Sequence, residues 1–408
     1  MHYFTHTFPD GLRLIHLPSD SPVSYCGFAV NAGARDEEEG EYGLAHFVEH
    51  LLFKGTAKRK ARYILNRMEN VGGELNAYTA KEDTFVYSIF MNEHFARAVE
   101  LLADIVFHSC FPPQEIEKEV EVILDEINTC KDSPSELIFD EFEDLLFGGH
   151  PLGHNILGDE ASLMRFTSEP GLAFTRRFYV PSNMVFFSMG RIKPEKIVRL
   201  VGEYVRQEAV PSLAGRRTPP PVLPPQNKCI RKDTHQAHII IGGPAYGMYG
   251  NERKRTALFL LNNLLGGPGM NSRLNLSLRE KHGLVYNVES NFTSYTDTGL
   301  VSVYFGTDPK HTEKALHLVR RELSRLCSAG LTTSQLTAAK KQISGQMGVS
   351  ADHKESLFLA SGKQFLHYGR YESLSEVFKK IEDVSAGDVL EVANEVFSPD
   401  GLSSLIYT

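Results

Sequence analysis

The sequence has no apolar run of 18 residues, the length a helix needs to cross a bilayer, so we expect no membrane-spanning segment. It is also short of positive charge: 43 lysines and arginines face 51 aspartates and glutamates, a formal net charge of −8. Because nucleic-acid binding needs a basic surface to neutralise phosphates, this composition argues against such a partner. The absences therefore exclude an integral membrane protein and disfavour a nucleic-acid-binding one.

Cysteine is scarce as well. The five cysteines are odd in number and scattered along the chain, which is typical of reduced thiols rather than of a disulfide framework. The first residues lack the apolar core of a signal peptide, and Asp10 lies where an arginine-rich transit sequence would avoid acid. Together these features favour a cytoplasmic location.

The most informative segment is the string His46–His50 (HFVEH), which lies in an apolar stretch without helix breakers. Two histidines four residues apart share one face of a helix, close enough to bind a single metal ion. Glu49 precedes the second histidine, the inverse of the order in the commoner zinc-protease helix. The string indicates a zinc-binding helix, although an amphipathic helix with incidental histidines is the plain alternative.

A hydrolytic zinc site needs three protein ligands and an open position for water, so a third ligand has to come from elsewhere. The segment 112–127 begins with two prolines, and its apolar residues then recur at helical spacing beside a strip of carboxylates. Glu119 and Glu126 are two helical turns apart and therefore share a face of this expected helix. Taken alone, an acidic helix of this kind is more often a solvated surface.

These segments carry a resemblance to a known family. Residues 43–56 closely resemble the active-site helix of the pitrilysin family of zinc metallopeptidases, the inverzincins. Residues 72–79 resemble the family's active-site strand, and residues 122–126 resemble the segment that supplies its third zinc ligand. The match spans nearly the whole chain, which resembles the short members of the family such as the subunits of mitochondrial processing peptidase.

The resemblance implies a set of site residues. One zinc ion per chain would be held by His46, His50 and Glu126, while Glu119 falls on a glutamate near the metal that is not a ligand. Zinc lowers the pKa of a bound water and polarises the scissile carbonyl, and Glu49 is placed to accept the proton of that water.

A segment in the second half resembles the region that holds the family's substrate-binding arginine and tyrosine. These residues are seven apart and map to Arg279 and Tyr286, whereas Arg273 does not fit the spacing. The pair would stabilise a developing oxyanion or hold a substrate carbonyl. An ordinary surface arginine and a packed tyrosine are the alternative interpretation.

The stretch that contains Asn76, Ala77 and Tyr78 is expected to form an exposed strand edge. Such an edge can bind an extended peptide by strand addition, through main-chain hydrogen bonds that depend little on side-chain identity. We therefore predict a zinc-dependent endopeptidase that hydrolyses unstructured peptides or small unfolded polypeptides.

Two further sequence features have structural interpretations. The acidic run 36–41 precedes the helix, where negative charge favours the positive helix N-terminus; attraction of basic peptides is a second hypothesis. His150 and His154 flank Pro151 and Gly153, a turn rather than a helix, so we expect structural roles for them rather than metal binding.

The chain has the pattern of two copies of one unit. Six prolines between residues 211 and 225 mark a boundary. We expect an N-terminal zinc-binding catalytic domain over 1–210, a proline-rich linker over 211–228 and a C-terminal domain over 229–408. Both halves repeat the same order of strands and helices at an offset of about 212 to 218 residues.

The second copy is expected to be free of zinc. The stretch 258–268, which corresponds to His46–His50 at that offset, contains no histidine and no carboxylate. The C-terminal domain is thus a degenerate copy that carries the arginine and tyrosine pair.

The predicted fold class is α+β, with two similar domains that each consist of a mostly antiparallel sheet covered by helices. The resemblance implies that they form half of a clamshell and that short chains pair face to face. We predict a homodimer in which each zinc meets Arg279 and Tyr286 of the other chain. Two other classes stay open: a non-catalytic scaffold or partner subunit of the same fold, and a zinc hydrolase with a non-peptide substrate.

Overall fold

The computed structural model describes residues 3–205, 217–232 and 234–408. These residues form two compact units, each assembled from three stretches of chain. The first unit comprises Met1–Asn128, His154–Arg217 and Ala351–Glu372, and the second comprises Thr129–Gly153, Thr218–Ser350 and Ser373–Thr408. In the part of the chain that the structure describes, no helix is both long and apolar enough to cross a bilayer.

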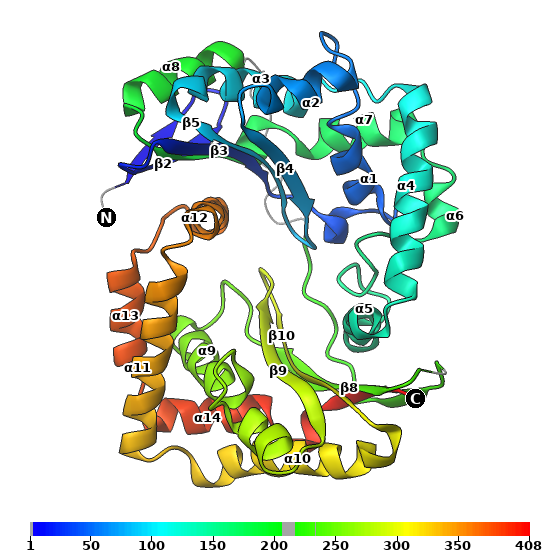
Figure 1. Ribbon diagram of the computed structural model, residues 1–408, viewed down its shortest axis with the longest axis vertical. Helices are drawn as coiled ribbons and strands as arrows, with labels where there is room; N and C mark the ends of the chain where they lie inside the picture. Colours follow the sequence, from blue (N-terminus) through cyan, green and yellow to red (C-terminus); the bar gives the residue numbers. More distant parts are fainter. Residues whose placement is uncertain (1–2, 206–216, 233) are drawn as a thin grey trace. The chain divides into compact units, whose positions relative to one another are not determined.

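The first unit is built on a six-stranded sheet with β4 at one edge (Figure 1). All neighbouring strands are antiparallel except β2 and β6, which are parallel. In spatial order the strands are β1 (Phe4–Thr7), β2 (Arg13–Pro18), β6 (Met184–Gly190), β3 (Val23–Val30), β5 (Thr84–Met91) and β4 (Glu74–Thr79).

The second unit repeats this arrangement with five strands. Again one neighbouring pair, β7 and β11, is parallel and the others are antiparallel. In spatial order the strands are β7 (Asn227–Ile230), β11 (Ser403–Tyr407), β8 (Ala237–Ala245), β10 (Gly299–Thr307) and β9 (Val285–Ser294). The order of these five strands matches β2-β6-β3-β5-β4 position by position, so the predicted α+β class with two similar, mostly antiparallel domains is confirmed.

Helices surround both sheets. The first unit contains α1 (Leu44–Leu51), α2 (Ala61–Glu69), α3 (Phe95–Phe107), most of α4 (Pro113–Lys131), α6 (Glu160–Leu163), α7 (Ser168–Phe178), α8 (Pro194–Tyr204), α12 (Lys354–Tyr368) and the short helices η1 (Ala34–Asp36), η2 (Asn92–His94) and η3 (Pro181–Asn183). The second unit contains α5 (Pro134–Phe147), α9 (Glu252–Gly266), α10 (Thr312–Ala329), α11 (Thr333–Ser350), α13 (Leu374–Glu382), α14 (Ala386–Val396), the π-helix η4 (Asn275–Glu280) and the short helices η5 (Pro309–His311) and η6 (Pro399–Gly401).

Strand residues of the first unit alternate between two apolar faces, because successive side chains of a strand point to opposite sides of a sheet. Leu14 and Phe28 face the core that contains α1, α3, α7 and α8. Ile15 and Phe187 face a second core, which is closed by Phe358 and other residues of α12. Both faces of the sheet are therefore buried, and Figure 1 shows α12 on the face opposite α3 and α8.

Each unit obtains one covering helix from the opposite half of the sequence. α12 follows β10 by about fifty residues in the chain, yet its apolar side chains pack on the sheet of the first unit. Conversely, Ile138 and Phe142 of α5 pack on Ile240 and Leu405 in the sheet of the second unit. This exchange goes beyond the sequence-based prediction, which assigns 1–210 and 229–408 to separate domains.

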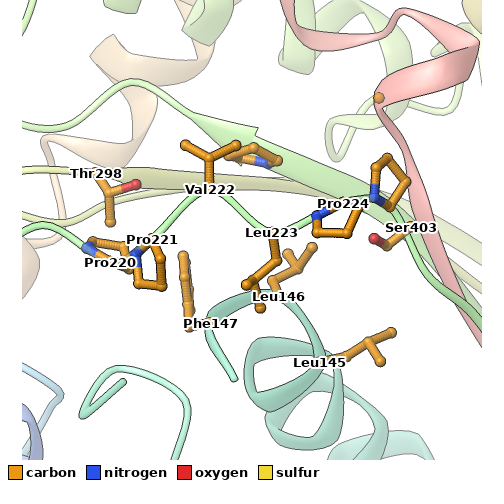
Figure 2. Close-up of a pocket in the computed structure, with 13 residues that line it drawn as sticks. Leu145, Leu146, Phe147, Pro220, Pro221, Val222, Leu223, Pro224, Thr298 and Ser403 are labelled. Carbon is orange, nitrogen blue, oxygen red and sulfur yellow. The ribbon is translucent and has the colours of Figure 1, made fainter. Parts of the chain in front are cut away.

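The predicted proline-rich linker 211–228 is described only from residue 217 onward, and its earlier residues lie outside the described chain. Pro220 to Pro225 line a small pocket with the end of α5 (Figure 2). In that view Leu223 points toward Leu146, and Pro221 lies beside Phe147. This stretch is thus packed on the second unit.

Candidate metal centre

The zinc-type string forms helix α1, whose two faces have different roles. Leu44, Phe47, Val48 and Leu51 are fully buried in the core of the first unit, which fixes the helix in place. His46 and His50, four residues apart, lie together, with ring centroids 4.5 Å from one another. Burial of the apolar face thus fixes the helix so that both imidazoles lie side by side on its other face.

Helix α4 brings Glu126 to these histidines. Its Oε2 lies 3.7 Å from His46 Nε2 and 3.6 Å from His50 Nε2. Both separations are too long for hydrogen bonds, so the three donor atoms surround a space without bonding one another. Ligands at about 2.1 Å from a tetrahedral zinc ion lie roughly 3.4 Å apart, so this donor set fits the ion.

The protonation state of His46 is compatible with metal binding, which requires neutral imidazole. Burial, followed by the charge of His50, lowers the pKa of His46 from 6.5 to about 3. Neutral His46 therefore has a lone pair to offer at ordinary pH.

A second glutamate of α4 orients His50. Glu119 Oε1 accepts a hydrogen bond from His50 Nδ1 at 2.8 Å, which leaves Nε2 to face the metal position. Lys54 forms an ion pair with the same carboxylate. Burial opposes ionisation of Glu119, but His50 and Lys54 outweigh it, and the pKa of Glu119 is lowered. Glu119 therefore stays an acceptor.

Glu49 lies beside the three donors without belonging to the cluster. It is 8% exposed, and its Oε2 accepts a hydrogen bond of 2.8 Å from the Thr79 hydroxyl. Burial raises the pKa of Glu49 even though Thr79 and His50 act in the opposite direction. A carboxylate of raised pKa has greater affinity for a proton, as a general base requires.

The start of α1 is held by a carboxylate from the acidic run. Glu37 Oε2 and Oε1 accept hydrogen bonds from the backbone N–H groups of Gly43 and Ala45, at 3.0 and 2.8 Å. The predicted helix-start role of the acidic run is thus seen in this residue. His154 Nε2 donates a third hydrogen bond to Glu37, at 2.9 Å. The expected structural role of this histidine is therefore confirmed.

The predicted substrate strand is β4, at the edge of the sheet. Asn76, Ala77 and Tyr78 pair with Tyr87, Val86 and Phe85 of β5 on one side only. Thr79 ends the strand and contacts Glu49, so this edge begins directly beside the candidate centre. Among the described residues no strand pairs with the other edge of β4.

Arg279 and Tyr286 come together in the second unit. Arg279 lies on the π-helix η4, and Tyr286 is the second residue of the edge strand β9. The guanidinium carbon is 5.6 Å from the tyrosine ring centroid, a cation–π distance. Tyr286 is 84% exposed, so most of its ring is free of contacts within the chain.

The structure thus brings together the donors His46, His50 and Glu126, with Glu49 beside them. Separately, it brings Arg279 together with Tyr286. Thr79 is a functional contact that sequence reasoning misses, although it ends the strand segment recognised there. The partner of His154 is also missed: the sequence pattern indicates a turn but does not reveal which carboxylate the turn will contact.

The chain is similar to known protein families and solved structures. The family described as insulinase (peptidase family M16) matches residues 14–160, and the peptidase M16 inactive domain matches residues 165–343. Among curated proteins, the chain is similar to the uncharacterized zinc protease YmxG of Bacillus subtilis, with 31% identity over 98% of this chain and 97% of the relative. An uncharacterized zinc protease of Streptomyces coelicolor is 33% identical over 96% of this chain and 86% of the relative.

Two solved structures share the fold. A peptidase M16 inactive domain from Pseudomonas fluorescens has a TM-score of 0.91 at 21% identity and covers 100% of this chain and 98% of its own. A protease from Helicobacter pylori has a TM-score of 0.91 at 20% identity, with coverage of 100% and 99%.

Proposed function

The chain belongs to the insulinase family of peptidases, family M16, and we propose that it is a zinc-dependent endopeptidase acting on unstructured peptides. The observation that carries this proposal is the donor set of His46, His50 and Glu126 around an ion-sized space, with Glu49 buried next to it. The name zinc protease, given to relatives that match nearly the whole chain, supports it.

His46, His50 and Glu126 would hold one zinc ion. When bound, the ion supplies a water of lowered pKa and polarises the scissile carbonyl. Glu49 accepts the proton of that water and passes it to the leaving amine. The Thr79 hydroxyl fixes one oxygen of the Glu49 carboxylate and thereby orients the carboxylate for proton transfer.

The edge of β4 would hold the substrate as an added strand. Backbone N–H and C=O groups of Asn76, Ala77 and Tyr78 on the unpaired side bind an extended peptide next to Glu49. Because folded proteins rarely offer an extended segment for such pairing, we expect unstructured peptides and small unfolded polypeptides to be the substrates.

The test is cleavage of a library of unstructured peptides by the wild type, by Glu49→Gln and by Glu121→Gln. Glu121 is an exposed residue of α4 and serves as a matched control for the loss of one carboxylate. We expect the wild type and Glu121→Gln to cut, and Glu49→Gln to retain zinc without cutting. A wild type that contains zinc and leaves every peptide intact would contradict the proposal.

We further propose that the chain works as a homodimer in which Arg279 and Tyr286 of one chain serve the zinc site of the other. The exposed ring of Tyr286 and the half-exposed Arg279 beside it are available to a second molecule. In that role they would hold the substrate carbonyl and stabilise its developing negative charge.

Mixing two inactive variants tests this arrangement. When Glu49→Gln and Arg279→Ala chains exchange freely, half of the dimers are mixed and one of their two sites has both intact residues. We therefore expect recovery of about a quarter of wild-type activity if sites are shared between chains. Unchanged inactivity of a mixture that forms mixed dimers would contradict a shared site.

A further inference from the structure

The beginning of helix α1 depends on a side chain from outside the helix. Gly43 occupies the cap position with φ of 91° and has no side chain to accept a hydrogen bond from the first turn. The Glu37 carboxylate takes this role: its two oxygens accept from Gly43 N and Ala45 N. His46 follows Ala45 directly, so the carboxylate is anchored one residue before the first donor of the metal centre.

Glu37 is in turn held by the loop that contains His154. The Glu37 side chain is 0% exposed, and His154 Nε2 is its side-chain donor, at 2.9 Å. His154 stacks on Tyr42, with ring centroids 4.3 Å apart and planes 24° apart, and its carbonyl oxygen accepts from Lys81. The imidazole is therefore held by Glu37 and Tyr42, and the backbone of the same residue is held by Lys81.

The same loop touches the start of the helix through its backbone. A Cβ atom on Gly43 would lie 2.5 Å from the Leu157 carbonyl oxygen, and one on Gly158 would lie 2.1 Å from the Tyr42 carbonyl oxygen. No side chain fits between the two segments. The backbone of the loop 154–158 thus packs directly against the backbone of residues 42–43.

We propose that His154 is a positioning residue for zinc binding: by holding Glu37 it sets the start of α1 and hence the direction of His46. The eight residues of α1 leave little length over which an error at the start can be absorbed. His46 lies in the first turn, so a change in the first turn moves its ring relative to His50 and Glu126. This inference rests on the proposed zinc site.

The atoms involved define a sharp pair of variants. In His154→Gln the side-chain amide nitrogen takes the place of Nε2 and can still donate to Glu37, whereas in His154→Asn it takes the place of Nδ1 and cannot reach. We expect the zinc dissociation constant to rise about 10- to 100-fold in His154→Asn and by less than about threefold in His154→Gln. Competition with a chromophoric chelator measures both constants without reliance on activity.

Two control variants separate positioning from general damage. His150→Ala removes the other histidine of the same loop, which contacts the Thr218 carbonyl instead of Glu37. Glu39→Gln removes an exposed carboxylate of the acidic run, in contrast to Glu37→Gln, whose amide group cannot accept from both backbone N–H groups. We expect wild-type zinc affinity in both controls and weakened affinity in Glu37→Gln.

The melting temperatures of the zinc-free and zinc-loaded forms complete the test. Weaker zinc binding reduces the rise in melting temperature that zinc produces, whereas a purely structural defect lowers both temperatures equally. Equal zinc affinity in His154→Asn, His154→Gln and the wild type would overturn the inference. A wild type that binds no zinc would instead overturn the proposed function.

Discussion

Replacing Gly362 by alanine tests whether α12 is an integral part of the first unit. Gly362 is buried on α12 and faces the ring of Phe187 on β6. An added Cβ would lie 2.6, 2.8 and 2.9 Å from three atoms of this ring, whereas carbon atoms in contact are ordinarily about 3.5 Å or more apart. The ring or the helix therefore has to move by nearly an ångström.

Neither partner can move easily. Phe187 is fully buried: it stacks on Phe358, with ring centroids 4.3 Å apart, and meets Phe85 edge to face, with centroids 5.4 Å apart. Overpacking of such a site costs up to about 3 kcal/mol, and the better helix propensity of alanine returns about 1 kcal/mol. We expect Gly362→Ala to lower the free energy of unfolding by about 2 kcal/mol.

Gly345→Ala is the matched control. Gly345 lies in the interior of α11, and no atom is within 4 Å of the position of an added Cβ. This variant should be more stable than wild type by roughly 0.5 to 1 kcal/mol, which sets the two variants about 3 kcal/mol apart. Urea unfolding followed by circular dichroism suits a chain that contains no tryptophan. Equal stability of the two alanine variants would refute the packing of α12 on Phe187.

Three further predictions concern single side chains. Burial lowers the pKa of His16 from 6.5 to about 4, so the stability gained from its neutral ring is present above pH 6.5 and lost as the pH falls toward 4. Between pH 7 and 4.5 the unfolding free energy of the wild type should fall by on the order of 2 kcal/mol more than that of His16→Asn. Urea titrations in which both proteins lose the same unfolding free energy would contradict this. Thr79→Val removes the hydroxyl that donates to Glu49, so we expect kcat/KM to fall about 10-fold or more at unchanged zinc content; a fall explained by zinc loss would count against it. Glu119→Gln should raise the zinc dissociation constant about 10- to 100-fold, because the amide no longer holds the His50 ring as a carboxylate does, and chelator competition that finds no change would contradict this role.

Local spacing predicted much of the candidate centre. His46 and His50 are neighbours on any helix, and the proline start and apolar spacing before Glu126 identify a second helix. The repeated order of strands likewise follows from the repeated pattern of the two halves. These features depend on contacts within one element, or on a family resemblance that already includes the sequence separation between two elements.

The remaining features depend on which distant segments meet. The apolar residues of α12 show that it must be covered, but they do not show which sheet covers it. The same holds for His154: its sequence neighbours indicate a turn, while its role comes from a carboxylate 117 residues away. A sequence pattern shows that a residue is buried but not which distant segment covers it, so such partners are known only from the structure.

The exchange of α5 and α12 has a consequence for synthesis. A ribosome has completed every strand of the first sheet by Gly190, yet the helix that covers Ile15, Ala29 and Phe187 ends only at Tyr368. At about 5 to 20 residues per second, one apolar face of that sheet stays uncovered for roughly 10 to 40 seconds. The nascent chain would present a hydrophobic surface to chaperones throughout this interval. The first unit cannot complete its fold before most of the second unit has been synthesised.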